Sequence, residues 1–239
     1  MGDKSLNNLL KWSIENTASG PDGTTNEAPR STLSPEALAE LMGGPSDADL
    51  MRDSMAAIVS SDPEITLESK LIAFDNLEQL IESLDNANVL SNLGLWTPLL
   101  ECLAHDEDEI RLMAAWCIGT AVQNNEPSQE RLVALGGVER LVQMSIGKRL
   151  PASSSANGDG GDGEKTEETR QQETNNVRRK AVYALSSAVR NYQPAMDVCA
   201  AELRRQGEQV GGDGKAIDAT DMDAVDVIIN GLRERVRST

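Results

Sequence analysis

The stretch from Ile110 to Pro127, IRLMAAWCIGTAVQNNEP, indicates the fold because it recurs without a gap as VRRKAVYALSSAVRNYQP, from Val177 to Pro194. An arginine, an aromatic residue, an asparagine and the final proline occupy matching positions in both copies. In the first copy Ala114, Ile118, Ala121 and Val122 lie three or four residues apart, so they form one stripe on a helix. The proline then ends that helix or begins the next.

Two further similarities extend this pattern into a repeat. Residues 71–81 form a more degenerate copy, about 41 residues before the first, within the roughly 40–47 residues of HEAT and armadillo units. Residues 93–100 match 135–142, with glycine supplying the turn before a third helix. Three helices per unit favour an all-α, armadillo-like right-handed solenoid of three to four repeats over HEAT repeats. An irregular helical bundle with chance similarity is the alternative.

An insertion interrupts the repeat. The two best copies lie 67 residues apart, and the excess falls within 148–175, a Gly-, Ser- and acid-rich stretch. This composition predicts a disordered insertion. Lengthening a short connection to this extent costs roughly 2 kcal/mol of closure entropy, so the core can continue across it.

Composition excludes several classes of protein. The 239 residues carry a formal charge of −17, and aromatic residues make up only 3%. Such a chain is repelled by nucleic acid and anionic membranes, and no apolar run approaches the roughly 20 residues of a membrane span. We therefore expect a cytoplasmic protein, with nuclear entry left open. Cys102, Cys117 and Cys199 lie within apolar helical patterns, which predicts buried, reduced thiols.

The two ends flank the repeats. Residues 17–33, rich in Gly, Pro and Thr, predict a flexible linker. Before it, Leu9, Leu10, Trp12 and Ile14 cover one broad helical face, which suits either a packed cap or a docking segment. Capping signals predict short helices from Ser34, from Ser46 to Val59 and from Asp62-Pro63. Residues 221–236 predict a final capping helix with acids first and arginines last.

Catalytic chemistry has little support. Residues 158–163 match G-x-G-x-x-G, but no strand precedes them and two aspartates would repel a phosphate. His105 is the single histidine, so Ser-His-Asp, Cys-His and multi-histidine zinc sites are disfavoured, and we expect a solvated or capping residue there. We expect no enzyme activity, no cofactor and no metal.

Four blocks in order carry a family likeness: 9–16 (LLKWSIEN), 71–78 (LIAFDNLE), 113–125 (MAAWCIGTAVQNN) and 178–192 (RRKAVYALSSAVRNY). Together they resemble the armadillo-type nucleotide exchange factor of the cytosolic 70-kDa heat-shock chaperone, in its fungal form. The resemblance implies a release segment at 1–16, the linker at 17–33, a cap and first repeats at 34–147, the insertion at 148–175, and the last repeat with its cap at 176–239.

The resemblance also implies a function. A monomeric co-chaperone of this family grips the chaperone's nucleotide-binding domain, promotes ADP release, and uses its N-terminal segment, through Leu9, Leu10, Trp12 and Ile14, to release bound substrate. In armadillo proteins third helices line the binding face, so helical phase within 97–105, 137–146 and 195–206 points to partner contacts. Those contacts are Glu101, His105, Arg140, Gln143 and Met144. An armadillo peptide-binding adaptor or a plain scaffold is the alternative.

Overall fold

The computed structural model describes residues 44–151, 172–211 and 216–238. The chain divides into two units, 1–46 and 47–239, and the description that follows concerns the second. The predicted release segment, the linker, the helix expected from Ser34 and the central part of the insertion lie outside the described residues. Among the described helices, none combines the length and apolar character that a membrane span requires.

The described part of the second unit is all-α, as predicted. Its elements are α3 (Asp47–Val59), α4 (Leu67–Ile81), α5 (Leu84–Asn92), α6 (Trp96–Glu101), the 3-10 helix η1 (Cys102–Ala104), α7 (Asp108–Ala121), α8 (Glu126–Ala134), α9 (Gly137–Ser145), α11 (Asn175–Val189), α12 (Gln193–Arg205) and α13 (Met222–Ser238).

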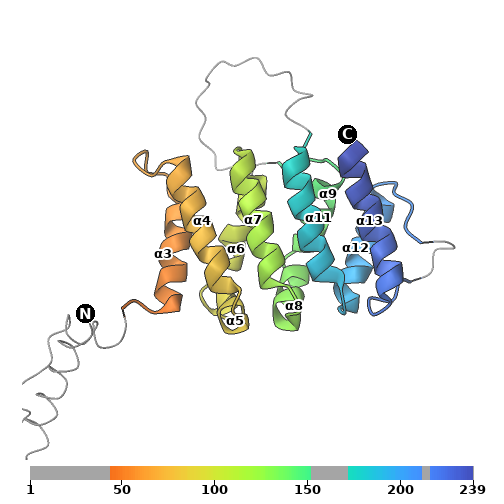
Figure 1. Cartoon of the computed structure of the whole chain (residues 1–239), viewed down its shortest axis with the longest axis horizontal. Coiled ribbons are helices and arrows are strands. Elements are labelled where there is room, and N and C mark those ends of the chain that lie inside the picture. Colours follow the sequence, from red (N-terminus) through yellow and green to blue (C-terminus); the bar gives the residue numbers. More distant parts are fainter. Residues whose placement is uncertain (1–43, 152–171, 212–215, 239) are drawn as a thin grey trace, which may run out of the picture. The chain divides into compact units, whose positions relative to one another are not determined.

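Three-helix units build the row of helices, which confirms the armadillo-like repeat. The first unit is α4–α5–α6 and the second is α7–α8–α9. Gly94 and Gly136 occupy the left-handed region, with φ of 70° and 69°, in the turns before the third helices. The third unit departs from the pattern, since α12 follows α11 and no helix lies in the described residues between 206 and 221. The long helices α4, α7, α11 and α13 lie side by side (Figure 1).

The apolar stripes of the repeat face the core. Ala114, Ile118, Ala121 and Val122 are fully buried, as are their counterparts Ala181, Leu185, Ala188 and Val189. The three cysteines are free and buried, as predicted. Burial raises the pKa of Cys102 to about 11 and that of Cys199 to about 12, and it raises the pKa of Cys117 as well. Their thiols therefore stay protonated and pack as small apolar groups.

Gly119 allows the close packing of α7 against α11. A Cβ atom at Gly119 would lie 2.5 Å from Cε1 of Tyr183, closer than Cβ atoms approach, and 3.1 Å from Cα of Ala184, a tight contact. Glycine at this position thus lets the Tyr183 ring lie directly against the α7 backbone.

The arginine that recurs in the repeat fastens α7 and α11 to the segments that precede them. Arg111 donates to the carbonyl oxygens of His105 and Asp106, at 2.7 and 2.8 Å. Arg178 donates in the same way to the carbonyl oxygen of Ser145, at the end of α9. Each arginine also bonds a residue three positions earlier, Asp108 or Asn175. The shared arginine therefore satisfies carbonyl groups that a helix end leaves without partners.

The two ends of the insertion meet. Lys148 and Gln172 form an isolated bridge, and the amide of Glu173 donates to the carbonyl oxygen of Gly147 at 2.8 Å. Because α11 packs against both α7 and α9, the core continues across the insertion, as predicted.

Helix boundaries agree with the sequence at both ends of the described unit but not at α4. The helix expected up to Val59 and the C-terminal helix are both present. The start predicted at Asp62-Pro63 is wrong, because Asp62 forms a turn in which its side chain accepts from the amide of Glu64. Thr66 caps the helix instead, accepting from the amide of Ser69 at 3.2 Å, so α4 begins at Leu67.

Candidate partner-binding surface

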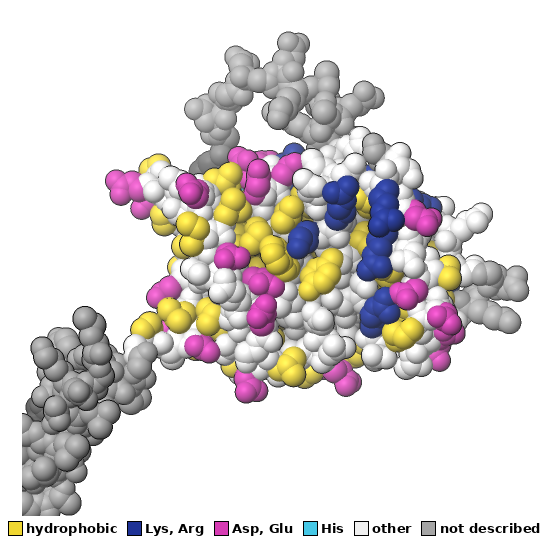
Figure 2. All heavy atoms as spheres, in the orientation of Figure 1, with side chains coloured by type: hydrophobic (Ala, Val, Ile, Leu, Met, Phe, Trp, Pro, Cys, Tyr) yellow, Lys and Arg dark blue, Asp and Glu magenta, His cyan; other side chains and the backbone are white. Residues whose placement is uncertain are grey.

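The long helices carry apolar side chains that the core buries only in part. On α7, Leu112, Met113 and Trp116 are half-buried and lie on the side of the helix away from the stripe of Ala114 and Ile118. Figure 2 shows hydrophobic side chains gathered over α4 and α7 on this face. Ile72 on α4 is 57% exposed. Contiguous exposed apolar groups of this kind are typical of protein-binding surfaces.

Trp116 and Tyr183 occupy the same position in successive copies of the repeat, and they flank a lysine. The Lys180 ammonium lies 3.5 Å from the centroid of the Trp116 ring and 5.6 Å from that of Tyr183. Burial lowers the pKa of Lys180, while the negative charge of Glu78 opposes that shift. A cation over an aromatic face contributes about 0.5–1 kcal/mol where it is exposed. The two rings are thereby held in a fixed arrangement on adjacent helices.

We define the apolar patch as Ile72, Leu112, Met113, Trp116 and Tyr183, which come from α4, α7 and α11. Two further bonds support it. Thr120 donates to a carboxylate oxygen of the buried Glu78 at 2.7 Å, which ties α7 to α4. The Tyr183 hydroxyl donates to Gln123 at 3.4 Å, which ties α11 to α7. The patch therefore spans three helices whose spacing is set by the core beneath them.

Basic side chains adjoin the apolar patch. Figure 2 shows Lys and Arg gathered over α11 and α13, whereas acidic side chains lie mostly towards the edges of this face. The face thus combines an aromatic centre with a positive flank, a combination common in protein interfaces, where Trp, Tyr and Arg are enriched.

The predicted contact residues lie mainly on α6, on α9 and after η1. We call the shorter helices behind the long ones in Figure 1 the second layer. Glu101 is exposed at the end of α6, and half-buried His105 follows η1. His105 accepts from the amide of Glu107 through Nδ1, the capping role expected of it, and burial, then the charge of Lys70, lowers its pKa. Arg140 donates to the carbonyl oxygen of Leu100 at 3.1 Å.

Gln143 and Met144 on α9 also contribute to contacts between α9 and its neighbouring helices. Gln143 donates to Glu202 on α12 at 3.0 Å. Met144 has no exposed surface, so its prediction as an exposed contact is wrong. The reason is that α9 packs against α8, α11 and α12 at once, which buries most of its circumference. A contact role for Glu101, His105, Arg140 and Gln143 stays a prediction.

The sequence contained a signal for the apolar patch that went unused. Leu112, Met113 and Trp116 are apolar yet lie outside the stripe of Ala114, Ile118 and Ala121 on the same helix. A helix that is apolar on two sides either is fully enclosed or binds a partner with its second side.

Comparison with known proteins identifies the family. The family model "Nucleotide exchange factor Fes1" matches residues 6–90, and a HEAT-repeat model matches residues 95–124. A relative in Gibberella zeae, "Hsp70 nucleotide exchange factor FES1", is 52% identical over 237 residues, which cover 99% of each chain. The chain belongs to the Fes1 family of nucleotide exchange factors.

Other members of the Fes1 family are also similar. A Neurospora crassa relative is 46% identical over 267 aligned positions, again covering 99% of each chain. The Saccharomyces cerevisiae relative is 39% identical over 192 residues, or 79% of this chain and 57% of that protein. Both are named Hsp70 nucleotide exchange factors. The apolar patch thus lies on a member of the Fes1 family whose likeness to its relatives extends over the whole chain.

Proposed function

We propose that this member of the Fes1 family is a co-chaperone that binds the nucleotide-binding domain of an Hsp70 chaperone and promotes release of ADP. The observation that carries the proposal is the 52% identity to an Hsp70 nucleotide exchange factor over 99% of both chains. The chain acts as a binding partner, so no residue of its own takes part in chemistry on the nucleotide.

Binding alone is sufficient for this activity. The open state of a chaperone has a low affinity for nucleotide. A surface that binds this state more tightly than the closed state shifts the population towards it. By reciprocity, nucleotide affinity falls by the same factor, typically 5- to 150-fold. A rigid surface serves such coupling well, because it does not adapt to the closed state. The close contact of α7 with α11 at Gly119 supports that rigidity.

The apolar patch is the surface that we assign to the chaperone. Trp116 and Tyr183 offer large, ordered apolar area, of the kind that dominates binding energy in interfaces. In the second layer, by contrast, Arg140 and Gln143 already bond to neighbouring helices, and Met144 is buried. These residues therefore have less free side-chain surface to offer a partner.

The N-terminal segment supplies the second part of the proposed function. Leu9, Leu10, Trp12 and Ile14 form a short apolar sequence ahead of a linker rich in Gly, Pro and Thr. Such a segment suits a site that takes short apolar peptides, and it would compete there with bound substrate. We place this activity in the cytoplasm and expect a monomer to perform it.

Release of a fluorescent ADP analogue from a purified Hsp70 tests the exchange activity. Adding the full-length protein should raise the dissociation rate by about tenfold or more, within the usual range of such coupling. An unchanged dissociation rate would exclude nucleotide exchange.

A second measurement separates the two activities. Replacing Leu9, Leu10 and Trp12 by Ala should leave ADP release unchanged but slow the displacement of a labelled peptide from the chaperone. Equal loss of both activities would show that the segment acts as a structural cap instead. Sedimentation velocity of the same samples checks the monomeric state.

A further inference from the structure

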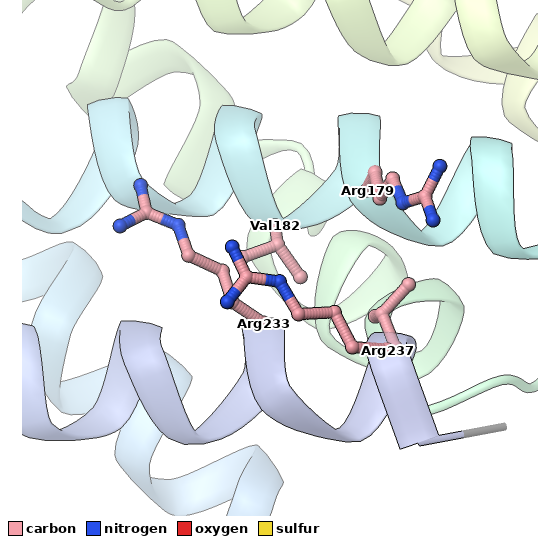
Figure 3. Close-up of a pocket in the computed structure, with 5 residues that line it drawn as sticks. Arg179, Val182, Arg233 and Arg237 are labelled. Atoms are coloured by element: carbon pink, nitrogen blue, oxygen red, sulfur yellow. The ribbon is translucent and has the colours of Figure 1, made fainter.

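A basic groove lies between α11 and α13. Arg179 and Val182 from α11 line a pocket of about 180 Å³ together with Arg233, Val236 and Arg237 from α13. Figure 3 shows the arginine side chains spread along the two helices, with Arg237 extending towards Val182. We call this set the arginine groove. None of its members belongs to the apolar patch.

The three arginines have no carboxylate partner among the described residues. Arg179 donates only to the side chain of Asn176, at 3.3 Å, and Arg233 only to that of Asn230, at 3.0 Å. Other arginines are paired with acids: Arg111 with Glu173, Arg149 with Asp106, Arg190 with Asp226, Arg205 with Glu202 and Arg235 with Glu208.

The total charge makes this arrangement unusual. The chain has 39 acidic and 22 basic residues, so acids are abundant, yet three exposed guanidinium groups along one pocket lack them. Like charges held near one another repel, and an anion placed among them removes that repulsion. The guanidinium group is also suited to binding a carboxylate through two parallel hydrogen bonds.

The shape of the groove selects among anions. The arginines follow the length of two helices instead of surrounding one point, and Val182 and Val236 lie beneath them, each only 1% exposed. A single small inorganic anion would not use this length. Nucleic acid and anionic membranes would be opposed by the net charge of −17. An extended acidic peptide can place successive carboxylates on the arginines.

We propose that the arginine groove binds an acidic linear segment of a partner protein, with Glu or Asp side chains on Arg179, Arg233 and Arg237. The groove lies on the same face as the apolar patch but shares no residue with it, and the proposal does not depend on nucleotide exchange. Because the contacts are charged and exposed, binding should weaken as salt concentration rises.

Fluorescence anisotropy of the full-length protein with a short labelled peptide of Glu, Asp and Leu provides the test. A peptide with Gln and Asn in place of the acids is its control. The variant Arg179→Gln/Arg233→Gln/Arg237→Gln should bind the acidic peptide about tenfold or more weakly, given the strength of charge-assisted pairs. The matched variant Arg52→Gln/Arg131→Gln/Arg204→Gln removes the same charge elsewhere and should change affinity by less than about twofold. Circular dichroism establishes that both variants are folded.

Three results would overturn the proposal. Equal weakening in the two triple variants would show a general effect of net charge. Equal affinity for the acidic and the neutral peptide would remove the role of the carboxylates. Full displacement of the peptide by an equal concentration of inorganic phosphate would reduce the groove to a simple anion site.

Discussion

Arg111 and Glu173, 62 residues apart in sequence, form a bidentate ion pair in the core, with Nε–Oε2 and Nη2–Oε1 distances of 2.8 Å. Neither side chain is more than 1% exposed. Burial on its own would lower the pKa of Arg111, but the hydrogen bonds that Arg111 donates to Glu173 and Asp108, together with the charges of these two carboxylates, more than offset it and raise the pKa. The pair joins the start of α7 to the segment in which the chain returns from the insertion.

Replacing Glu173 with Ala should destabilise the protein by about 3 kcal/mol, since it removes the fully buried acidic partner of Arg111 and leaves the partly exposed Asp108 as the remaining one. Urea unfolding followed by circular dichroism measures the loss. Asp106→Asn is the matched control, because it breaks an ion pair whose acid is 87% exposed, and it should cost less than about 1 kcal/mol. Similar losses in the two variants would contradict the structural importance of the buried pair.

The central part of the insertion, residues 153–170, should be dispensable for folding. Gly147 and Glu173 are hydrogen-bonded, so a short linker can span the gap. Replacing residues 153–170 with Gly-Ser-Gly should retain the fold and raise the free energy of unfolding by about 1 kcal/mol through a shorter closing loop. Thermal and urea unfolding of the two proteins provide the comparison. A large loss of stability would mean that the replaced residues contribute contacts to the core.

Much of the fold could be predicted because it depends on local periodicity. The spacing of Ala114 and Ile118, and of their counterparts Ala181 and Leu185, predicted both the helices and the side of each helix that is buried. The partner of Arg111 could not be found in this way, since Glu173 lies near the end of the insertion and no pattern links the two. The prediction that Met144 is exposed was wrong for a related reason. Its burial depends on three neighbouring helices, which cannot be read from the helical periodicity of α9 alone.

Gly119→Ala and Gly231→Ala should have opposite effects on stability. Alanine in a helix is favoured over glycine by about 1 kcal/mol. At Gly231 on α13 nothing lies within 4 Å of an added Cβ, so the substitution should stabilise. At Gly119 the added atom would overlap Tyr183 and approach Ala184, and overpacking of this kind costs about 1–3 kcal/mol. Differential scanning calorimetry measures whether each variant raises or lowers the melting temperature. A stabilising Gly119→Ala would contradict the close contact of α7 with α11.

Glu202 should make a pH-dependent contribution to stability. Hydrogen bonds from Arg205, then from Gln206 and Gln143, lower its pKa to about 2. A carboxylate with a depressed pKa stabilises the fold above its unfolded pKa, near 4.3, and that stabilisation is lost as pH falls towards 2. Because Arg205 is largely exposed, the contribution should be only about 1 kcal/mol. Urea unfolding of the wild type and Glu202→Gln between pH 7 and 3 should show their difference shrinking at acid pH, and a constant difference would contradict the assignment.

The last prediction decides which layer of helices contacts the chaperone. If the apolar patch binds Hsp70, Trp116→Ala should weaken the complex by about 2 kcal/mol or more, as expected for a central aromatic residue. The variants Arg140→Ala and Gln143→Ala, whose side chains bond to Leu100 and Glu202 within the protein, should alter the affinity by less than about 0.5 kcal/mol. Isothermal titration calorimetry with the isolated nucleotide-binding domain measures all three, after circular dichroism has shown that each is folded. The reverse order of effects would move the interface to α6 and α9, where Glu101, His105, Arg140 and Gln143 lie. Comparable weakening by all three would require an interface that includes both layers, which a single rigid partner domain could reach only at an end of the row.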